Sequence, residues 1–214
     1  MDKNLSLIVE KRLERTAKAL GANRIDAYVV QNTQELYEKI REVLKEGESC
    51  SVGGSMTLRE TGVEAMLQNG PYEYYDRYAP GANLREIYYQ ALGCDVYFTS
   101  ANAVTEDGKL YCMDGNGNRI AAMAYGPRNV VVVAGANKIV TDIEAARRRN
   151  REVSAPANGV RLEKTTPCAL TGVCRDCATD ERMCNMELVI EKGREREPGT
   201  RRIKVFLLPD SYGY

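Results

Sequence analysis

The run NVVVVA at residues 129–134 constrains the fold of this chain more than any other stretch. It is the most hydrophobic β-branched segment of the sequence, with consecutive valines from Val130 to Val133. A half-exposed strand alternates apolar and polar residues, whereas an unbroken β-branched run is typical of a strand that is covered on both faces. The run therefore predicts a central strand in a sheet that carries helices on both sides.

Helical and strand patterns alternate along the rest of the chain. Apolar residues recur at the helical period from Leu5 to Leu20, and capping boxes begin further helices at Asn32, Thr57 and Thr141. This alternation predicts an α/β domain with at least one antiparallel hairpin in or beside its sheet. Further helices are expected at 83–92 and 118–125, and strands at 25–30, 49–52, 72–75, 94–99, 187–192 and 203–208, the last two joined by a turn over 193–200.

Charge and composition exclude several classes of function. The 214 residues carry 30 basic and 30 acidic side chains, so the net charge gives no reason to expect nucleic acid or an anionic membrane as a partner. No apolar run approaches the roughly 20 residues that a membrane-spanning helix needs. The start of the chain is charged and amphipathic, unlike a secretory signal, so we expect a cytoplasmic protein. The absence of histidine excludes nucleophiles activated by imidazole and imidazole metal ligands.

A hairpin and a glycine-rich turn form the most distinctive polar stretch. Two alternating segments, 103–106 and 109–113, flank Asp107-Gly108, the dipeptide that suits a two-residue type I′ turn. The sequence DGNGN then leads into a helix at 119–124, whose first turn would offer free N–H groups to an anion. Alternatively, these glycines only turn a corner, because a lone G-x-G is a weak signal.

Two other strand ends carry polar residues. Gly53, Gly54 and Ser55 follow one strand and precede a helix, and Asn137 and Lys138 follow the valine strand. Ligands of open α/β sheets collect beyond the carboxyl ends of strands, so these positions are candidates for a site. By contrast, the run Arg147-Arg148-Arg149 is interpreted as a solvated last helical turn, where cations complement the helix dipole.

Four of the seven cysteines, Cys168, Cys174, Cys177 and Cys184, lie within 17 residues. Only one pair has the C-x-x-C spacing of a zinc knuckle, and the longer arms suit a [4Fe-4S] cluster at least as well. Free reduced thiols are the remaining reading. We expect Pro156 and its neighbours at 155–158 to break the chain before this segment. The expected parts are an α/β domain over 1–164, the cysteine segment over 165–186, and strands over 187–214 that complete the domain.

Six further motifs follow one another along the chain: GGSMTLRE at 53–60, TSANAVTEDG at 99–108, DGNGNR at 114–119, GANKIV at 135–140, APAN at 155–158 and TPCALTGVCRDC at 166–177. Together they resemble the LUD-domain proteins of lactate utilisation, and the resemblance covers residues 1 to 214 in order. It implies a Rossmann-like α/β/α sandwich similar to the NagB, ribose-5-phosphate isomerase and CoA-transferase superfamily. It also implies a role beside an iron–sulfur system that oxidises lactate to pyruvate, and favours a [4Fe-4S] cluster over zinc at the four cysteines.

The resemblance also points to a set of ligand-binding residues. They would bind a small anion such as a carboxylate or phosphate, with cationic side chains for its charge and Glu106 or Asp114 as catalytic candidates for proton transfer. We expect the side chains of Asp114 and Arg119 to face solvent. The alternatives are a module that senses a sugar phosphate or CoA ester without catalysis, and a subunit that docks on an iron–sulfur oxidase. The set is Gly53, Gly54, Ser55, Asn102, Glu106, Asp114, Gly115, Gly117, Asn118, Arg119, Asn137 and Lys138.

Overall fold

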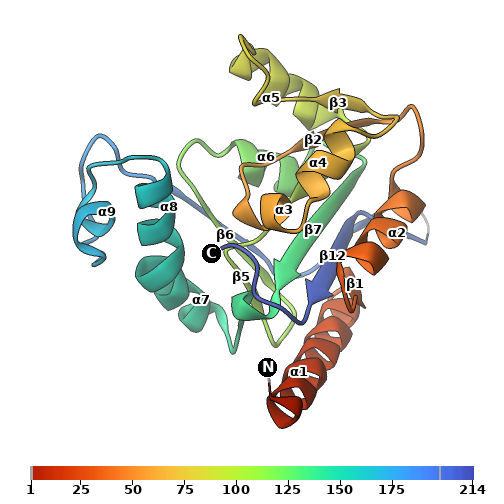
Figure 1. Ribbon diagram of the computed structural model, residues 1–214, viewed down its shortest axis with the longest axis horizontal. Helices are drawn as coiled ribbons and strands as arrows, with labels where there is room; N and C mark the ends of the chain where they lie inside the picture. The colour runs from red at the N-terminus through yellow and green to blue at the C-terminus, as the bar shows by residue number, and fades with distance from the viewer. Residues whose placement is uncertain (1, 198) are drawn as a thin grey trace.

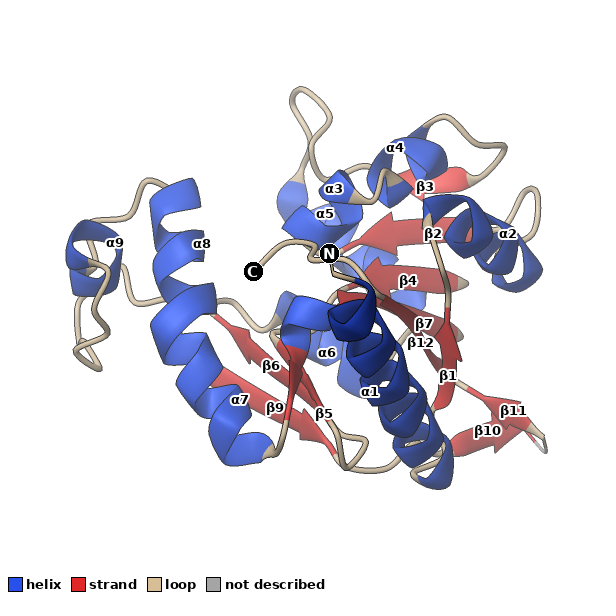
Figure 2. Ribbon diagram, turned by 60° about the horizontal axis from the view of Figure 1, so that its bottom comes forward, coloured by secondary structure: helices blue, strands red, loops and turns tan. Residues whose placement is uncertain are grey.

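The main layer of the protein is a six-stranded parallel sheet (Figures 1 and 2). The computed structural model describes residues 2–197 and 199–214. In order across the sheet, the strands are β1 (Asp26–Val29), β12 (Ile203–Leu208), β7 (Asn129–Gly135), β4 (Val96–Thr99), β2 (Ser49–Val52) and β3 (Glu73–Tyr75). Strand β7 contains the valine run and pairs on both sides, with β12 and β4, as predicted for a central strand.

Helices cover both faces of this sheet, so the fold is a Rossmann-like α/β/α sandwich. Val131 and Val133 pack with α2 (Thr33–Val43), α3 (Met56–Glu60) and α4 (Val63–Gln68). Val130 and Val132 point to the other face, where α1 (Lys3–Ala22) and α6 (Asn118–Ala124) contribute to the core. Helix α5 (Leu84–Gly93) packs through Ala91 beside β4. No helix among the described residues combines the length and the apolar character that crossing a membrane requires.

A second, four-stranded sheet packs against the α1 face of the main sheet (Figure 2). Its order is β8 (Ile139–Val140), β5 (Ala103–Thr105), β6 (Leu110–Asp114) and β9 (Met186–Ile190). The two late strands were expected to be joined by one turn, but β9 pairs with β6 in this sheet while β12 lies within the main sheet. The small hairpin of β10 (Glu195–Glu197) and β11 (Thr200–Arg201) separates them.

The predicted hairpin forms, but its loop has three residues instead of two. Ala103 pairs with Tyr111 and Val104 with Leu110, and the Thr105 amide donates to the carbonyl oxygen of Lys109 at 3.0 Å. Only Gly108 in the loop has a positive φ, of 85°. A type I′ turn needs two such residues, so the two-residue prediction was wrong. The geometry is that of a turn closed by a glycine bulge, which Asp-Gly serves equally well.

One long helical arm replaces the break expected at 155–158. Helix α7 (Ile143–Arg149) continues through a π-helical turn (Asn150–Ser154) into α8 (Ala155–Arg161), and α9 (Pro167–Thr171) follows. Pro156 stands in the first turn of α8, where its missing N–H needs no partner within that helix. The single helix expected from Thr57 is likewise divided into α3 and α4, at Gly62. The remaining helical element is the 3-10 turn η1 (Ala136–Lys138).

Candidate functional site

A cleft of about 460 Å³ opens at the carboxyl ends of the parallel strands. The residues that follow β2, β4 and β7 form its floor, and the helical arm and residues 180–184 form the opposite wall. Tyr214 also lines it, and in Figures 1 and 2 the end of the chain lies between the main sheet and α8. The cleft therefore collects residues that are far apart in the sequence.

Three cations bind three successive carbonyl groups at the end of β4. In the segment Ser100–Asn102, the carbonyl oxygens accept hydrogen bonds from Arg119, Lys138 and Arg149 in that order, at 3.1, 3.2 and 2.7 Å. These cations come from α6, η1 and α7. Among the described residues, only Arg119 of the three pairs with an Asp or Glu carboxylate. Basic side chains therefore outnumber acidic ones at the floor of the cleft.

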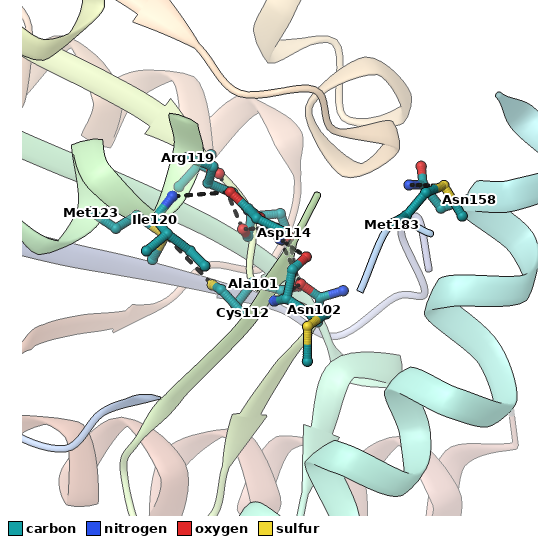
Figure 3. A network of polar contacts seen from close by, with 12 residues as sticks. Ala101, Asn102, Cys112, Asp114, Arg119, Ile120, Met123, Asn158 and Met183 are labelled. Carbon is teal, nitrogen blue, oxygen red and sulfur yellow. Dashed lines mark hydrogen bonds and ion pairs between the residues drawn. The ribbon is translucent and has the colours of Figure 1, made fainter. Parts of the chain in front are cut away.

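That carboxylate is Asp114, and it occupies the position where an external anion was expected (Figure 3). Its Oδ1 lies 2.6 Å from Nη2 of Arg119, and its Oδ2 accepts a hydrogen bond of 3.1 Å from the amide of Ile120 in the first turn of α6. Arg119 also donates to the side-chain oxygen of Asn102 at 2.7 Å. The glycine turn thus supplies its own anion to the helix terminus.

Asp114 is buried and Arg119 is mostly buried, which corrects the expectation that both face solvent. Asp114 is 8% exposed and the Arg119 side chain 16%. Arg119 contacts the ends of β4 and β6 through the carbonyl groups of Ser100 and Met113. The pair therefore joins the two sheets, and removing either partner would disturb the fold as well as the cleft.

Lys138 is a buried lysine that pairs with no Asp or Glu side chain in the described parts of the chain. It is 3% exposed, and its Nζ donates only to the main-chain oxygens of Ala101 and Tyr214, at 3.2 and 3.0 Å. Burial, with smaller contributions from the charges of Arg149 and Arg119, lowers the pKa of its amine to about 7. The amine of Lys138 is therefore only partly protonated at neutral pH.

Two more arginines line the cleft without a carboxylate partner among the residues described. The Nε atom of Arg77 is buried and makes no hydrogen bond there, while its guanidinium lies over the rings of Tyr78 and Tyr88. Arg161 on α8 donates to the side-chain oxygen of Asn158, at 2.7 and 3.1 Å. Both guanidinium groups therefore keep donors for a ligand.

The structure brings eight of the predicted ligand-binding residues to this cleft. They are Gly54, Ser55, Asn102, Asp114, Gly115, Asn118, Arg119 and Lys138. Gly53 lies behind them against Tyr97, and Gly117 caps α6 with a φ of 77°. Asn137 bonds Tyr212 and Gly213 of the C-terminal segment. Binding of a ligand by the eight stays a prediction.

Glu106, a catalytic candidate from the sequence, lies outside the cleft. Its carboxylate pairs with Arg12 at 2.7 Å and with Arg15 at 3.4 Å, both on α1. Glu106 therefore attaches the hairpin loop to the first helix. Of the two catalytic candidates, only Asp114 lines the cleft, and its oxygens are already bonded to Arg119 and Ile120.

Sequence reasoning missed most of the helical arm. Arg149, interpreted as solvated, is half-buried and bonds the carbonyl oxygens of Asn102 and Asn137, so that interpretation was wrong for this residue. Asn150, Ser154 and Asn158 also line the cleft. Their spacing of four residues places them on one helix face, a polar stripe that the sequence displays. The expected break at Pro156 concealed this stripe.

The four clustered cysteines lie along the outer wall. Cys168 on α9 is buried, while Cys174, Cys177 and Cys184 are half-exposed. Cys184 lines the cleft. Burial is the main cause that raises the pKa of its thiol, and Cys174 and Cys168 lie near enough to raise it further. In the described residues, no three Cys, Asp or Glu side chains converge as a ready metal site. The other three cysteines are buried in the cores.

Fold and cleft together define a Rossmann-like α/β/α protein with a cationic site at the carboxyl ends of its parallel strands. The profile of the LUD domain matches residues 13–208, and the chain belongs to this family. A DUF162 family protein from Deinococcus radiodurans, known from a crystal structure, is similar. It is 14% identical, the alignment covers 95% of this chain and 98% of that one, and the TM-score is 0.47. No curated protein matches the chain.

Proposed function

We propose that this LUD-domain protein binds a small carboxylic acid of the 2-hydroxy-acid class, such as lactate, in the cleft, and serves lactate utilisation in the cytoplasm. The observation that supports this is the row of three basic side chains at Ser100–Asn102, of which only Arg119 pairs with an Asp or Glu carboxylate among the described residues. A small anion would offset the unbalanced positive charge. The polar groups of Ser55 and Asn118 in the same cleft could bond a hydroxyl group.

The carboxylate of the ligand would bind Arg77 or Arg161. Arg119 already donates to Asp114, Ser100, Asn102 and Met113, so it has little donor capacity left. Arg77 and Arg161 lack acidic partners within the described chain, and a guanidinium can bond a carboxylate through two N–H groups at once. The position of these two arginines on opposite sides of the cleft would suit a small acid.

Titration calorimetry of the purified chain with lactate, pyruvate and inorganic phosphate tests this function. Arg161→Ala should weaken lactate binding roughly tenfold to a hundredfold, the value of a hydrogen-bonded charge pair. Arg148→Ala is the matched control, because Arg148 is exposed on the same helical arm and does not line the cleft. No binding of any acid, or equal affinity in both variants, would contradict the assignment. Binding of phosphate alone would favour the sugar-phosphate alternative.

We further propose that Cys168, Cys174, Cys177 and Cys184 hold a [4Fe-4S] cluster, with zinc as the alternative, and that the partner is an iron–sulfur oxidase. Four thiols from one short segment, without histidine, are a suitable donor set, and Cys184 lies within electrostatic range of Cys174 and Cys168. The residues after α9 form no strand or helix before β9, so Cys174, Cys177 and Cys184 lie in a loop that would have to rearrange around the buried Cys168 on α9. When bound, the cluster would supply one-electron transfer.

Anaerobic purification followed by assay of iron, labile sulfide and zinc tests the cluster. We expect iron and sulfide together with a visible absorption band that dithionite bleaches. Cys177→Ser should lose the metal, while Cys94→Ser is the control, since that thiol is buried beside α5 and donates to the Ala91 carbonyl oxygen. One zinc per chain without sulfide would overturn the iron assignment. Full metal content in Cys177→Ser would overturn the ligand set.

A further inference from the structure

We propose that the ligand of this cleft is a 2-hydroxy acid with a second anionic group at the far end of its chain. Arg161 would bind the carboxylate beside the hydroxyl group, and Arg77 would bind the second anionic group. The inference rests on the proposed function, because the cleft must first bind the carboxylate of such an acid. It narrows the substrate class from simple acids such as lactate to dianionic ones.

The basic side chains that line the cleft differ in whether an acid neutralises them. Three form ion pairs within the described chain: Arg119 with Asp114, Lys164 with Glu181 and Arg182 with Asp176, at 2.6, 3.3 and 2.9 Å. Lys138 is held by a main-chain oxygen of Tyr214 and is not counted here. Arg77 and Arg161 pair with no Asp or Glu side chain in the part of the chain that the structure describes. Two guanidinium groups are therefore available to a ligand, and a monocarboxylate would balance only one.

Neutral groups hold the guanidinium of Arg77 in place. Its Nη2 donates to the Tyr88 hydroxyl at 2.9 Å, and its Cζ lies 5.2 and 5.3 Å from the ring centres of Tyr88 and Tyr78. Its Nε is buried and has no hydrogen-bond partner among the described residues. Its Nη1 faces Gly54, where a Cβ would lie 3.6 Å away. The guanidinium is therefore oriented, keeps its charge and lacks an acceptor, as a contact for an anion requires.

Arg161 is held in a similar way on the helical arm. Its Nε and Nη2 donate to the side-chain oxygen of Asn158 at 3.1 and 2.7 Å. Burial raises the pKa of the Tyr214 phenol, and the charge of Arg161 opposes this rise, so the guanidinium lies close to the phenol. Asp180 also lines the cleft, but it is exposed and forms no ion pair within the described chain. The near neighbours of Arg161 thus orient it without cancelling its charge.

The size of the cleft favours a ligand longer than lactate, one of the smallest 2-hydroxy acids. Its volume of about 460 Å³ is typical of pockets that hold cofactors and drug-sized molecules. Arg77 follows β3 and lies beside Gly54, whereas Arg161 ends α8 in the helical arm (Figure 1). A chain with an anionic group at each end would engage both arginines. Either a carboxylate or a phosphate suits the second position, because a guanidinium binds both through two N–H groups.

Titration calorimetry of the full chain with matched pairs of acids tests the second anionic group. Malate is compared with malamate, in which an amide replaces the far carboxylate, and 3-phosphoglycerate with glycerate. Both members of each pair have the 2-hydroxy carboxylate. We expect the dianion of at least one pair to bind roughly tenfold to a hundredfold more tightly than its monoanionic partner. The pair with the larger preference distinguishes a carboxylate from a phosphate.

Variants of the two arginines assign the groups. Arg77→Gln should abolish the preference for the dianion, because the amide cannot pair with its second charge. Arg161→Gln should weaken both members of a pair alike and keep the preference. Arg148→Gln is the matched control and should behave as the wild type, because Arg148 is exposed on the arm and does not line the cleft. Thermal unfolding shows whether each variant folds, and the wild-type comparison decides the inference if Arg77→Gln does not.

Each outcome is decisive. Equal affinities within both pairs would overturn the inference, and the proposed function stands if lactate still binds. A preference that a folded Arg77→Gln variant retains would overturn the role of Arg77. If none of these acids binds, lactate included, both the inference and the proposed function fail.

Discussion

At the scale of single residues, Lys138 makes the stability of the fold depend on pH. Below about pH 7 its amine is protonated in both the folded and the unfolded chain. Between about 7 and 10.5 the unfolded chain binds a proton that the folded chain lacks, so this contribution to stability increases with pH. Lys138→Met removes the buried amine, and we expect the variant to be more stable than the wild type at pH 7.

This advantage of Lys138→Met should shrink as the pH rises. Each pH unit changes the contribution by at most about 1.4 kcal/mol, so urea unfolding at pH 7 and pH 9 should show a change of about 2 kcal/mol in the difference between the two proteins. Other groups titrate equally in both proteins and cancel in this comparison. A difference that is constant with pH would show that Lys138 has an ordinary pKa.

The ion pair of Asp114 and Arg119 leads to a second prediction. Asp114→Ala leaves a buried guanidinium without its anion and the Ile120 amide without its acceptor, so we expect a loss of about 3–5 kcal/mol in unfolding free energy. Glu64→Ala is the control, since its pair with the half-exposed Arg59 is worth less than about 1 kcal/mol. Equal losses in the two variants would contradict a structural role for the buried pair.

At the scale of elements, the turn of the hairpin can pack closely against α1 because Gly108 has no side chain. Gly108 has a φ of 85°, and a Cβ there would lie 2.4 Å from the carbonyl carbon of Ala19. Gly108→Ala should therefore cost both backbone strain and a displacement of α1. Gly47→Ala is the matched control, because Gly47 has a φ of 78° with open space around it.

Comparison of these two glycine variants by chemical denaturation isolates the contact. We expect Gly47→Ala to lower the free energy of unfolding by about 1 kcal/mol, because of the left-handed backbone alone. Gly108→Ala should lower it by at least twice that amount. Equal costs would show that the hairpin turn does not press on α1.

Elements were predictable from sequence where their signal is local. The valine run of β7 and the capping residue Asn32 lie beside the elements that they specify, and these formed as expected. The helices expected to begin at Thr57 and Thr141 also form, but their capping residues are Ser55 and Asp142. The pairing of β9 with β6 was not predictable, because a strand pattern does not name its neighbour. At Pro156 the local signal was misleading, because the preceding π turn allows the arm to continue.

At the scale of the whole molecule, only the residues at the floor of the cleft could be predicted from the sequence. Glycines and polar residues after β2, β4 and β7 meet because the carboxyl ends of parallel strands share one edge of the sheet. Tyr214 lines the cleft and Arg149 bonds the Asn102 carbonyl oxygen beneath it, and no spacing rule connects either residue to this place. Glu106 shows the reverse case, since it is close to the site in sequence but bonds α1 instead.

The C-terminal segment, residues 209–214, closes one side of the cleft by hydrogen bonds to two elements. The oxygen of Asp210 accepts from the Ala136 amide at 3.0 Å, and the amide of Gly213 donates to the Glu60 carboxylate at 2.6 Å. Gly213 has a φ of 58°, and a Cβ there would lie 2.6 Å from the hydroxyl of Thr57 on α3. Gly213→Ala should therefore detach the segment.

Hydrogen exchange measured by mass spectrometry can detect this detachment. In Gly213→Ala we expect faster exchange at the amides of Ala136 and residues 212–213, because their acceptors move away, while β12 keeps its protection in the centre of the main sheet. Gly81→Ala, at a positive φ with open space around it, is the control and should leave the segment protected. Since the main-chain oxygen of Tyr214 also covers Lys138, detachment should in addition speed the reaction of that amine with a small acylating reagent. Unchanged exchange in Gly213→Ala would mean that the segment does not depend on its contact with α3.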